Sequence, residues 1–309
     1  MLKLIIKQTN WGIIGSIFAF TIGFFVKTYV IREVGTIEWG RYATAHTFTM
    51  FSDTLLSLGI PFVILKFFPT LMTKSRKEAS FIVSKILRIS LILSFIFLSV
   101  MYFLAPILDQ YIYVNTNQFS YLLLIISIHA PISIFMGIIT SLYRSVLKIK
   151  EIILYGTFIG VTIRAFLTFI IFYFSNDILS FVIVEIFTQL IILFLMFYFF
   201  NKNELKLFSK SNKKNYQIND EIYDYGKRMY VNSIVLFLSG QSLSFILGIM
   251  LPPSKMGVYS ILLTITGVSL FLNKNLRKIF APIISKLYTE KKISQLNILY
   301  KRTTFIRTF

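Results

Sequence analysis

Two oppositely charged side chains, Arg164 and Glu185, lie deep within apolar stretches of this sequence. A charge at the centre of a bilayer costs about 2.5–3.5 kcal/mol on insertion scales, so each residue is a candidate for function. In a hydrated cavity, Arg164 would attract an anionic group of a ligand. The alternative is an ion pair that holds two helices together, because the expected depths of the two residues differ by only about 5 Å. Both interpretations remain open from the sequence.

Lys27 is a third charge inside an apolar stretch, and it ends a stripe of small residues. The stripe has spacings of four and three residues, which place Gly12, Ser16, Ala19 and Gly23 on the same helix face as Lys27. Such a stripe is typical of close helix packing. The alternative is a cavity wall, where the small side chains leave room for a bulky headgroup and Lys27 attracts its phosphate.

Asp53 and His129 are expected near mid-depth, where either residue could take part in proton or cation coupling. His129 precedes Pro131 by two residues, so the imidazole could instead bind a carbonyl that a helix break leaves free. Glu185 and Gln189 share a helix face, and interhelical hydrogen bonding is the structural alternative for this pair. No nucleophile, metal-ligand or phosphate-loop motif of an enzyme is present, and we expect no cofactor.

The elements that position these residues are long apolar stretches. The chain has 309 residues, of which 56% are hydrophobic, and a mean hydropathy of +0.73, more apolar surface than a soluble fold of this size can bury. Each stretch is near the ~20 residues that cross a bilayer as a helix, except the shorter last one. The sequence predicts an all-α integral membrane protein with about eight transmembrane helices, at 11–31, 42–65, 86–108, 120–142, 152–174, 178–200, 229–250 and 258–272.

The formal charge of +19 is distributed unevenly between the connectors. Of the 32 Lys and Arg residues, 27 fall in the N-terminal tail, in every second connector and after the last predicted span. By the positive-inside rule, the N-terminus and segment 201–228 are cytoplasmic, which predicts a multi-pass protein of the cytoplasmic (inner) membrane. The basic connectors would contact anionic membrane lipids, so no nucleic-acid partner is needed to explain the charge.

An offset of 217 residues aligns the beginning of the chain with its last part, with ten identities over positions 11–66. The alignment predicts two parallel lobes: a six-helix lobe at 1–200, a basic cytoplasmic linker at 201–228, and the start of a second lobe at 229–309. We expect the second lobe to stop after two helices, which would leave it incomplete.

Several segments, in order along the whole chain, resemble polysaccharide transporters. They are Ile31–Ala43, Leu58–Pro61, Lys66–Pro69, Arg144–Lys150, Pro252–Tyr259 and Ala281–Tyr288. This family includes the O-antigen (lipid-linked oligosaccharide) flippases of the multidrug/oligosaccharidyl-lipid/polysaccharide exporter superfamily. Its members usually have more helices than are expected here, so the resemblance implies a C-terminally truncated member.

The resemblance implies a flippase that moves a polyprenyl-diphosphate-linked oligosaccharide from the cytoplasmic to the outer leaflet during surface polysaccharide biosynthesis, alongside polysaccharide assembly proteins. Alternating access would occur through a cationic central cavity. The residues expected to hold the substrate phosphates are Lys27, Arg32 and Arg164, of which Lys27 and Arg32 match cavity positions of the related lipid II flippases. The residues expected to gate the cavity or couple an ion are Asp53, His129 and Glu185.

Three alternatives remain open. A multidrug-type cation antiporter would keep the fold, but the excess of Lys and Arg argues against cationic cargo. A membrane glycosyltransferase or polymerase would be expected to carry a large outer loop, and the outer connectors are short. A non-transporting truncated remnant or membrane scaffold would be consistent with the expected missing helices.

Overall fold

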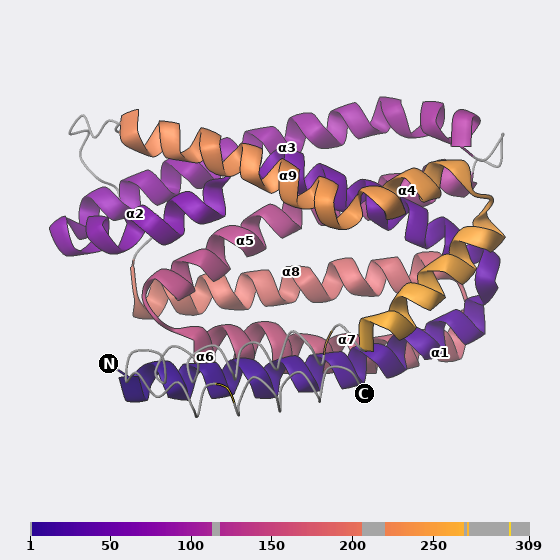
Figure 1. Cartoon of the computed structure of the whole chain (residues 1–309), viewed down its shortest axis with the longest axis horizontal. Coiled ribbons are helices and arrows are strands. Elements are labelled where there is room, and N and C mark those ends of the chain that lie inside the picture. The colour runs from indigo at the N-terminus through magenta and orange to yellow at the C-terminus, as the bar shows by residue number, and fades with distance from the viewer. Residues whose placement is uncertain (1, 113–117, 206–219, 269–270, 272–296, 298–309) are drawn as a thin grey trace.

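The computed structural model of the chain describes residues 2–112, 118–205, 220–268, 271 and 297, and nearly all of these are helical. Six helices are long and apolar enough to cross a membrane, which confirms the predicted all-α integral membrane fold. The helices lie roughly along one common direction (Figure 1). In order they are α1 (Leu2–Ser57), α2 (Ile60–Lys74), α3 (Arg76–Ile112), α4 (Gln118–Ser127), α5 (His129–Ser145), α6 (Ile149–Glu151), the π-helix η1 (Ile152–Ile159), α7 (Gly160–Phe174), α8 (Ile178–Asn203) and α9 (Asp220–Met250), followed by helical residues 253–268.

The first two predicted spans lie in one element, α1, on either side of a sharp bend. Gly35 has φ 79° and ψ 172° inside this helix, a conformation that strongly favours glycine. The bend reverses the direction of the chain, so α1 runs along the bundle and back again (Figure 1).

The second predicted span, 42–65, is wrong in its last part. The helix ends at Ser57 because Leu58 and Gly59 have positive φ angles of 46° and 70°, and α2 begins at Ile60. A side chain at position 59 would also lie 2.7 Å from the carbonyl oxygen of Gly226 in α9, so glycine permits a close approach of the backbones there. The last predicted span is helical up to residue 268, and its end at residue 272 lies outside the described residues.

The connectors alternate between the two ends of the bundle in the order expected from the charges. The beginning of α1 and the ends of α2, α5 and α8 lie at one end, and the bend at Gly35 and the ends of α3, α7 and α9 lie at the other (Figure 1). Between α8 and α9, helix extends into both sides of the predicted 201–228 linker, as far as Asn203 and from Asp220 onward.

Two apolar clusters form the core, one toward each end of the bundle. The cluster on the Gly35 side joins α1, α3, α4, α7 and α8, and its fully buried members include Val30, Phe119, Leu123, Ile126 and Val182. The other cluster joins α2, α3, α5 and α8, with Ile138, Ile139, Leu142, Met196 and Phe200 at its centre. Large apolar side chains such as Phe95 and Phe194 remain exposed on the outside, as expected for a surface that contacts lipid.

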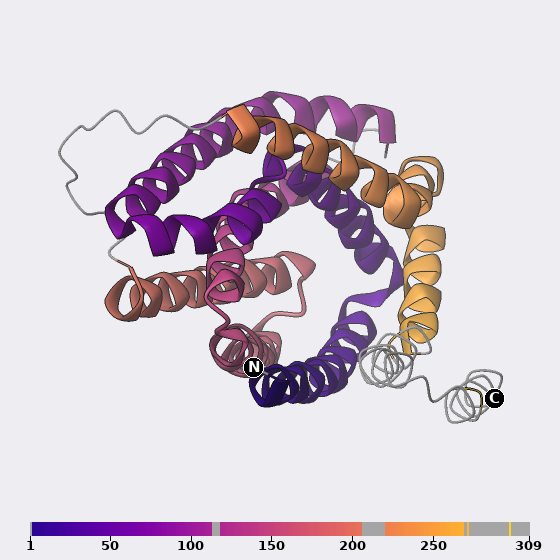
Figure 2. The ribbon, with the colours of Figure 1, turned by 60° about the vertical axis from the view of Figure 1, so that its left-hand side comes forward.

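Residues 253–268 pack against α1 through a reciprocal contact of two glycines (Figure 2). A Cβ atom at Gly40 would lie 1.8 Å from the carbonyl oxygen of Pro253, and one at Gly257 would lie 2.0 Å from that of Thr36. The offset of 217 residues found in the sequence relates Thr36 to Pro253 and Gly40 to Gly257. Each repeat therefore contributes the same two groups to the contact: a glycine, and the carbonyl of the residue four positions before it.

The reciprocal contact predicts that Gly40→Ala and Gly257→Ala have similar, destabilising effects. Either methyl group would collide with a backbone carbonyl that cannot rotate away, so the two segments would have to separate. Gly240→Ala is the matched control, because no described atom lies within 4 Å of its Cβ position, and alanine favours a helix by about 1 kcal/mol relative to glycine. Thermal unfolding of the purified variants tests this; a Gly40→Ala protein as stable as Gly240→Ala would contradict it.

Candidate functional site

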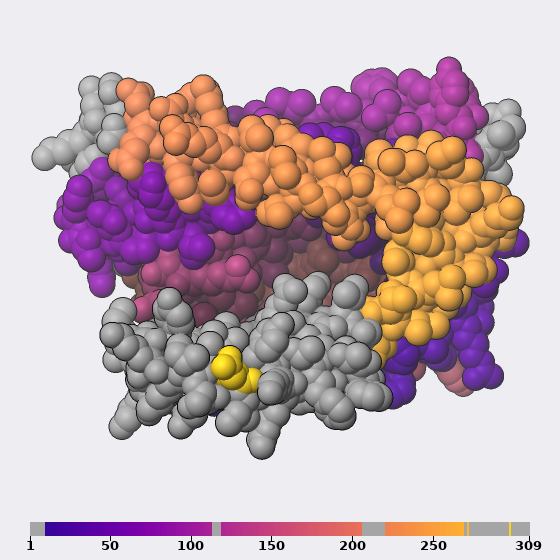
Figure 3. Space-filling model, viewed as in Figure 1, coloured from indigo at the N-terminus to yellow at the C-terminus, as the bar shows by residue number. Residues whose placement is uncertain are grey.

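A cavity of about 350 Å³ lies between both parts of α1, α7, α8, α9 and residues 253–268. The space-filling view shows the molecule hollowed beside α9 and residues 253–268 (Figure 3). We call this space the central cavity. Its polar lining consists of Lys27, Trp39, Tyr42, His46, Thr47, Arg164, Glu185, Gln241, Ser244, Ser260 and Thr264.

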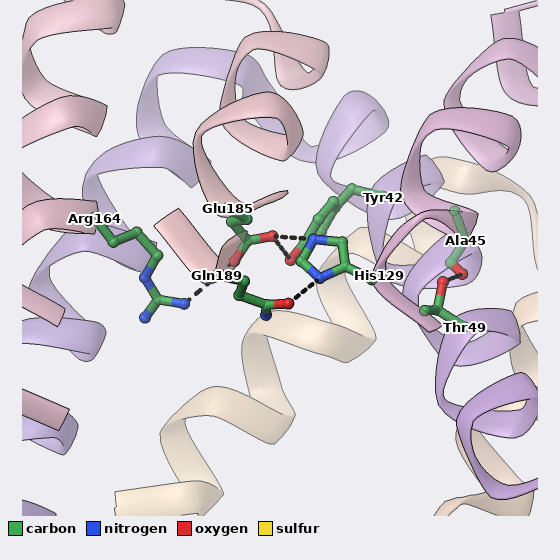
Figure 4. Close-up of polar contacts among 7 residues, drawn as sticks. All are labelled: Tyr42, Ala45, Thr49, His129, Arg164, Glu185 and Gln189. Atoms are coloured by element: carbon green, nitrogen blue, oxygen red, sulfur yellow. Dashed lines mark hydrogen bonds and ion pairs between the residues drawn. The ribbon is translucent and has the colours of Figure 1, made fainter. Parts of the chain in front are cut away.

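Glu185 is the centre of a polar cluster between the two apolar clusters (Figure 4). Its side chain is 10% exposed, and its Oε2 atom accepts a hydrogen bond of 2.8 Å from the hydroxyl of Tyr42. On α8, Val182 of one apolar cluster precedes Glu185 and Ile192 of the other follows it. The fold thus places the carboxylate between the two apolar clusters, where its charge needs partners.

Arg164 supplies the opposite charge from α7. Its Nη1 atom donates to Oε1 of Glu185 at 3.3 Å, so the structure brings together the two residues that the sequence left as either an ion pair or a ligand site. The Arg164 side chain is 33% exposed and lines the central cavity, and its Nη2 atom lies 3.8 Å from the Cβ position of Gly23. One long contact to Glu185 leaves other N–H donors of the guanidinium able to face the cavity.

His129 and Gln189 extend the cluster on its other side. The Nδ1 atom of His129 lies 3.0 Å from Oε1 of Gln189, and its Nε2 atom lies 3.9 Å from Oε2 of Glu185. The helix break expected near Pro131 is present, since α4 ends at Ser127 and α5 begins at His129. The imidazole contacts side chains of α8 rather than a carbonyl at the break.

Lys27 and Gly23 of the small-residue stripe line the central cavity. The Nζ atom of Lys27 lies 5.2 Å from the centre of the Trp39 ring, and the Trp39 indole N–H donates to Ser260 at 2.7 Å. Among the described residues, no atom lies within 4 Å of the Cβ position of Gly12. Gly23 and Lys27 therefore meet the alternative interpretation of the stripe, a cavity wall, whereas Gly12, Ser16 and Ala19 are not among the lining residues of this cavity.

Two other predicted site residues lie away from the central cavity. Arg32 is exposed near the bend of α1 and does not line it. Asp53 is half-buried, and Ser133 of α5 lies near its carboxyl group. The predicted substrate and coupling roles of all six residues remain predictions.

Tyr42 and His46 are site residues that the sequence analysis did not assign to the cavity. Their rings lie 5.7 Å apart, and both line the central cavity. The sequence contains a pattern that could have indicated these two residues. One helix face carries large side chains at spacings of three and four, namely Trp39, Tyr42, His46 and Met50.

Comparisons with known proteins agree with this architecture. A family model described as polysaccharide biosynthesis protein matches residues 5–287, and no curated protein matches the chain. A solved MATE multidrug transporter, DinF-BH, is similar with a TM-score of 0.70 and 18% identity over 95% of this chain and 67% of its own.

Two further solved structures share the fold. An outward-facing MATE family transporter of the MOP superfamily has a TM-score of 0.65 at 14% identity, over 96% of this chain and 68% of its own. A MOP superfamily transporter from Pyrococcus furiosus has a TM-score of 0.57 at 15% identity, over 95% and 68%. The chain thus spans about two thirds of the length of these proteins.

The contact between Arg164 and Glu185 predicts energetic coupling between the two positions. Arg164→Gln should lower the stability of the protein, because it leaves a buried carboxylate without its cation, and the loss should be smaller in a Glu185→Gln background. A double-mutant cycle of unfolding free energies should give a coupling of about 0.5–3 kcal/mol. Strictly additive effects would show that the pair does not interact in the folded protein.

Proposed function

Because the chain belongs to the polysaccharide biosynthesis protein family and shares the fold of membrane transporters, we propose that it acts as a flippase for a lipid-linked oligosaccharide. The substrate would move from the cytoplasmic to the outer leaflet during assembly of a surface polysaccharide. The observation that carries this proposal is the central cavity, which contains two cations, Lys27 and Arg164, between the helices of the bundle.

The physical problem of such transport is the headgroup. Each hydroxyl or phosphate group costs several kcal/mol to move into hydrocarbon without a partner, whereas the polyprenyl tail can stay in lipid. The central cavity offers hydroxyl, amide and indole groups for the sugar, and Lys27 and Arg164 for the diphosphate. Glu185 keeps Arg164 compensated while no substrate is bound, and a phosphate takes its place when substrate enters.

Alternating access requires that the cavity be closed at one end. The reciprocal contact of Gly40 and Gly257, together with the hydrogen bond from Trp39 to Ser260, joins α1 to residues 253–268 toward the Gly35 end of the bundle. In our proposal these contacts separate when the cavity opens to the outer side. Basic residues at the opposite end, such as Lys74, Arg76 and Lys202, would then contact anionic lipids of the cytoplasmic leaflet.

A cation antiporter of the same fold is the second candidate, and the multidrug transporters among the similar structures support it. Glu185 would be the acidic group that binds such cargo. Its carboxylate, however, is already bound by Arg164 and Tyr42, and Lys27 adds a second positive charge to the cavity. An anionic substrate therefore suits the described lining better. A chain that scaffolds other membrane proteins without transport is the third possibility, and the export experiment below distinguishes it.

The proposed orientation can be tested with single cysteines, because the chain has none of its own. Asn203→Cys, at the end of α8, should be protected from a membrane-impermeant thiol reagent in intact cells. Ser175→Cys, exposed after α7, should be labelled. The reverse pattern would place the N-terminus outside.

Arg164→Ala should reduce export of the oligosaccharide about tenfold to a hundredfold, since a hydrogen bond to a charged group contributes about 1.5–3 kcal/mol. Surface polysaccharide would be measured in a deletion strain that carries each variant, with membrane insertion checked by fractionation. Lys255→Ala, which removes an exposed cation outside the cavity, is the control. Unchanged export by Arg164→Ala would remove this residue from the substrate site, and no export by the unaltered chain would refute transport by this chain.

A further inference from the structure

A groove of about 610 Å³ lies on the lipid-facing surface of the bundle, between α3, α5 and α8. We call it the surface groove. Its floor consists of side chains that belong to the apolar cluster of α2, α3, α5 and α8 or pack against it, namely Leu87, Phe135, Leu193 and Phe197. Its walls are formed by exposed side chains, Leu91 on α3 and Leu190 and Phe194 on α8. The surface groove is therefore open to a molecule from the surrounding lipid.

The polar side chains of the surface groove lie toward the end of the bundle where α3 begins and α8 ends. They are Arg88 of α3 and Tyr198 and Asn201 of α8, and the rest of the described lining is apolar. Arg88 is exposed, and no carboxylate among the described residues forms an ion pair with it. The Nζ atom of Lys202 lies 6.0 Å from the centre of the Tyr198 ring, so a second cation lies beside this end. This end of the groove is thus positive, and no described acidic residue lines it.

The positive end of the surface groove lies at the expected depth of lipid headgroups. The apolar stretches predicted from the sequence begin at residue 86 in α3 and end at residue 200 in α8, so Arg88 and Asn201 lie where apolar and polar segments meet. By the positive-inside rule, this boundary faces the cytoplasm. From Asn201 to Leu190, α8 rises about 16 Å, roughly half of the ~30 Å thickness of the hydrocarbon. The length of the groove therefore matches the acyl-chain region of one leaflet.

We propose that the surface groove binds one anionic phospholipid of the cytoplasmic leaflet, with an acyl chain between α3 and α8 and the phosphate at Arg88. Apolar contact alone does not select a lipid, because lipid tails are as apolar as leucine side chains. Selection comes from the headgroup. A guanidinium binds phosphate oxygens in a bidentate manner, and basic pockets between membrane helices on the cytoplasmic side bind anionic headgroups. The site does not depend on the proposed function, because it needs no transport substrate.

A phospholipid fits the surface groove better than the proposed transport substrate or a second copy of the chain. Neither α3 nor α5 lines the central cavity, so the groove lies outside the space proposed for the oligosaccharide headgroup. Two copies packed groove to groove would bring their Arg88 side chains together, and like charges repel strongly at the edge of hydrocarbon. An anionic lipid instead supplies the counterion and fills the apolar part of the groove with one molecule.

The test measures which lipid lies next to a tryptophan placed in the surface groove of the whole purified chain. The chain has two tryptophans. Trp11→Phe removes the half-buried one, and Trp39, which is 2% exposed, remains as a constant background. In this protein, Phe194→Trp introduces the reporter into the groove wall. The matched control is Phe166→Trp, on the exposed surface of α7 and outside the groove.

Each protein is reconstituted in vesicles of phosphatidylglycerol and phosphatidylcholine in which one of the two lipids carries brominated acyl chains that quench tryptophan on contact. We expect phosphatidylglycerol to be preferred at Phe194→Trp, and the two lipids to quench Phe166→Trp equally. Arg88→Gln should lower the preference at Phe194→Trp about fivefold, the contribution of one cation near an anionic surface. Arg76→Gln, which removes an exposed cation of α3 outside the groove, should leave the preference unchanged.

Leu91→Trp, on the opposite wall, is a second reporter in case Phe194→Trp does not fold. The proposal is overturned if the two lipids quench the groove reporters equally, if Phe166→Trp shows the same preference, or if the preference persists in Arg88→Gln. Absence of quenching by either lipid would also overturn it, because a second copy or another protein would then fill the groove. Failure of oligosaccharide export with these quenching results intact would refute the proposed function and leave the lipid site in place.

Discussion

A carboxylate in the middle of a membrane helix bundle has to be compensated, and the arrangement around Glu185 meets this requirement. Arg164 provides the opposite charge, Tyr42 donates a hydrogen bond, and the Nε2 atom of His129 lies 3.9 Å from the carboxylate. These partners come from α7, α1 and α5, so one side chain on α8 fixes the relative positions of four helices. The same layer separates the two apolar clusters and leaves polar cavities beside it.

The compensation is incomplete, and this gives the site its chemistry. A fully buried, bidentate pair would serve mainly to hold helices together, whereas Arg164 keeps a third of its side chain exposed and makes one long contact. Its charge remains accessible to a competing anion. The sequence left two interpretations of Arg164, a structural ion pair with Glu185 and a ligand site. The two are compatible, as one state in which Arg164 is paired with Glu185 and another in which it binds an anion.

Hydropathy and charge predicted the elements well, because both depend on residues that are close together in the chain. The all-α membrane fold, the alternation of the connectors and the shared depth of Arg164 and Glu185 follow from counting along the sequence. The bond between Tyr42 and Glu185 joins residues 143 positions apart, and no local pattern indicates which helices become neighbours. The interruption of the second span coincides with Gly59 and Pro61, a local signal for a helix end, whereas the close approach of Gly59 to the backbone of α9 lies outside a local window.

The contact between Gly40 and Gly257 also has a consequence for ancestry. Gly40 meets the carbonyl of Pro253, and Gly257 meets the carbonyl of Thr36. Pro253 and Thr36 occupy equivalent positions, each four residues before the glycine of its own repeat. An interface in which the same patch is used on both sides is isologous, the kind that joins two identical subunits across a two-fold axis. A protein made of a single repeat would carry both halves of this contact, so an ancestral homodimer could have closed in the same way before duplication and fusion joined the two copies.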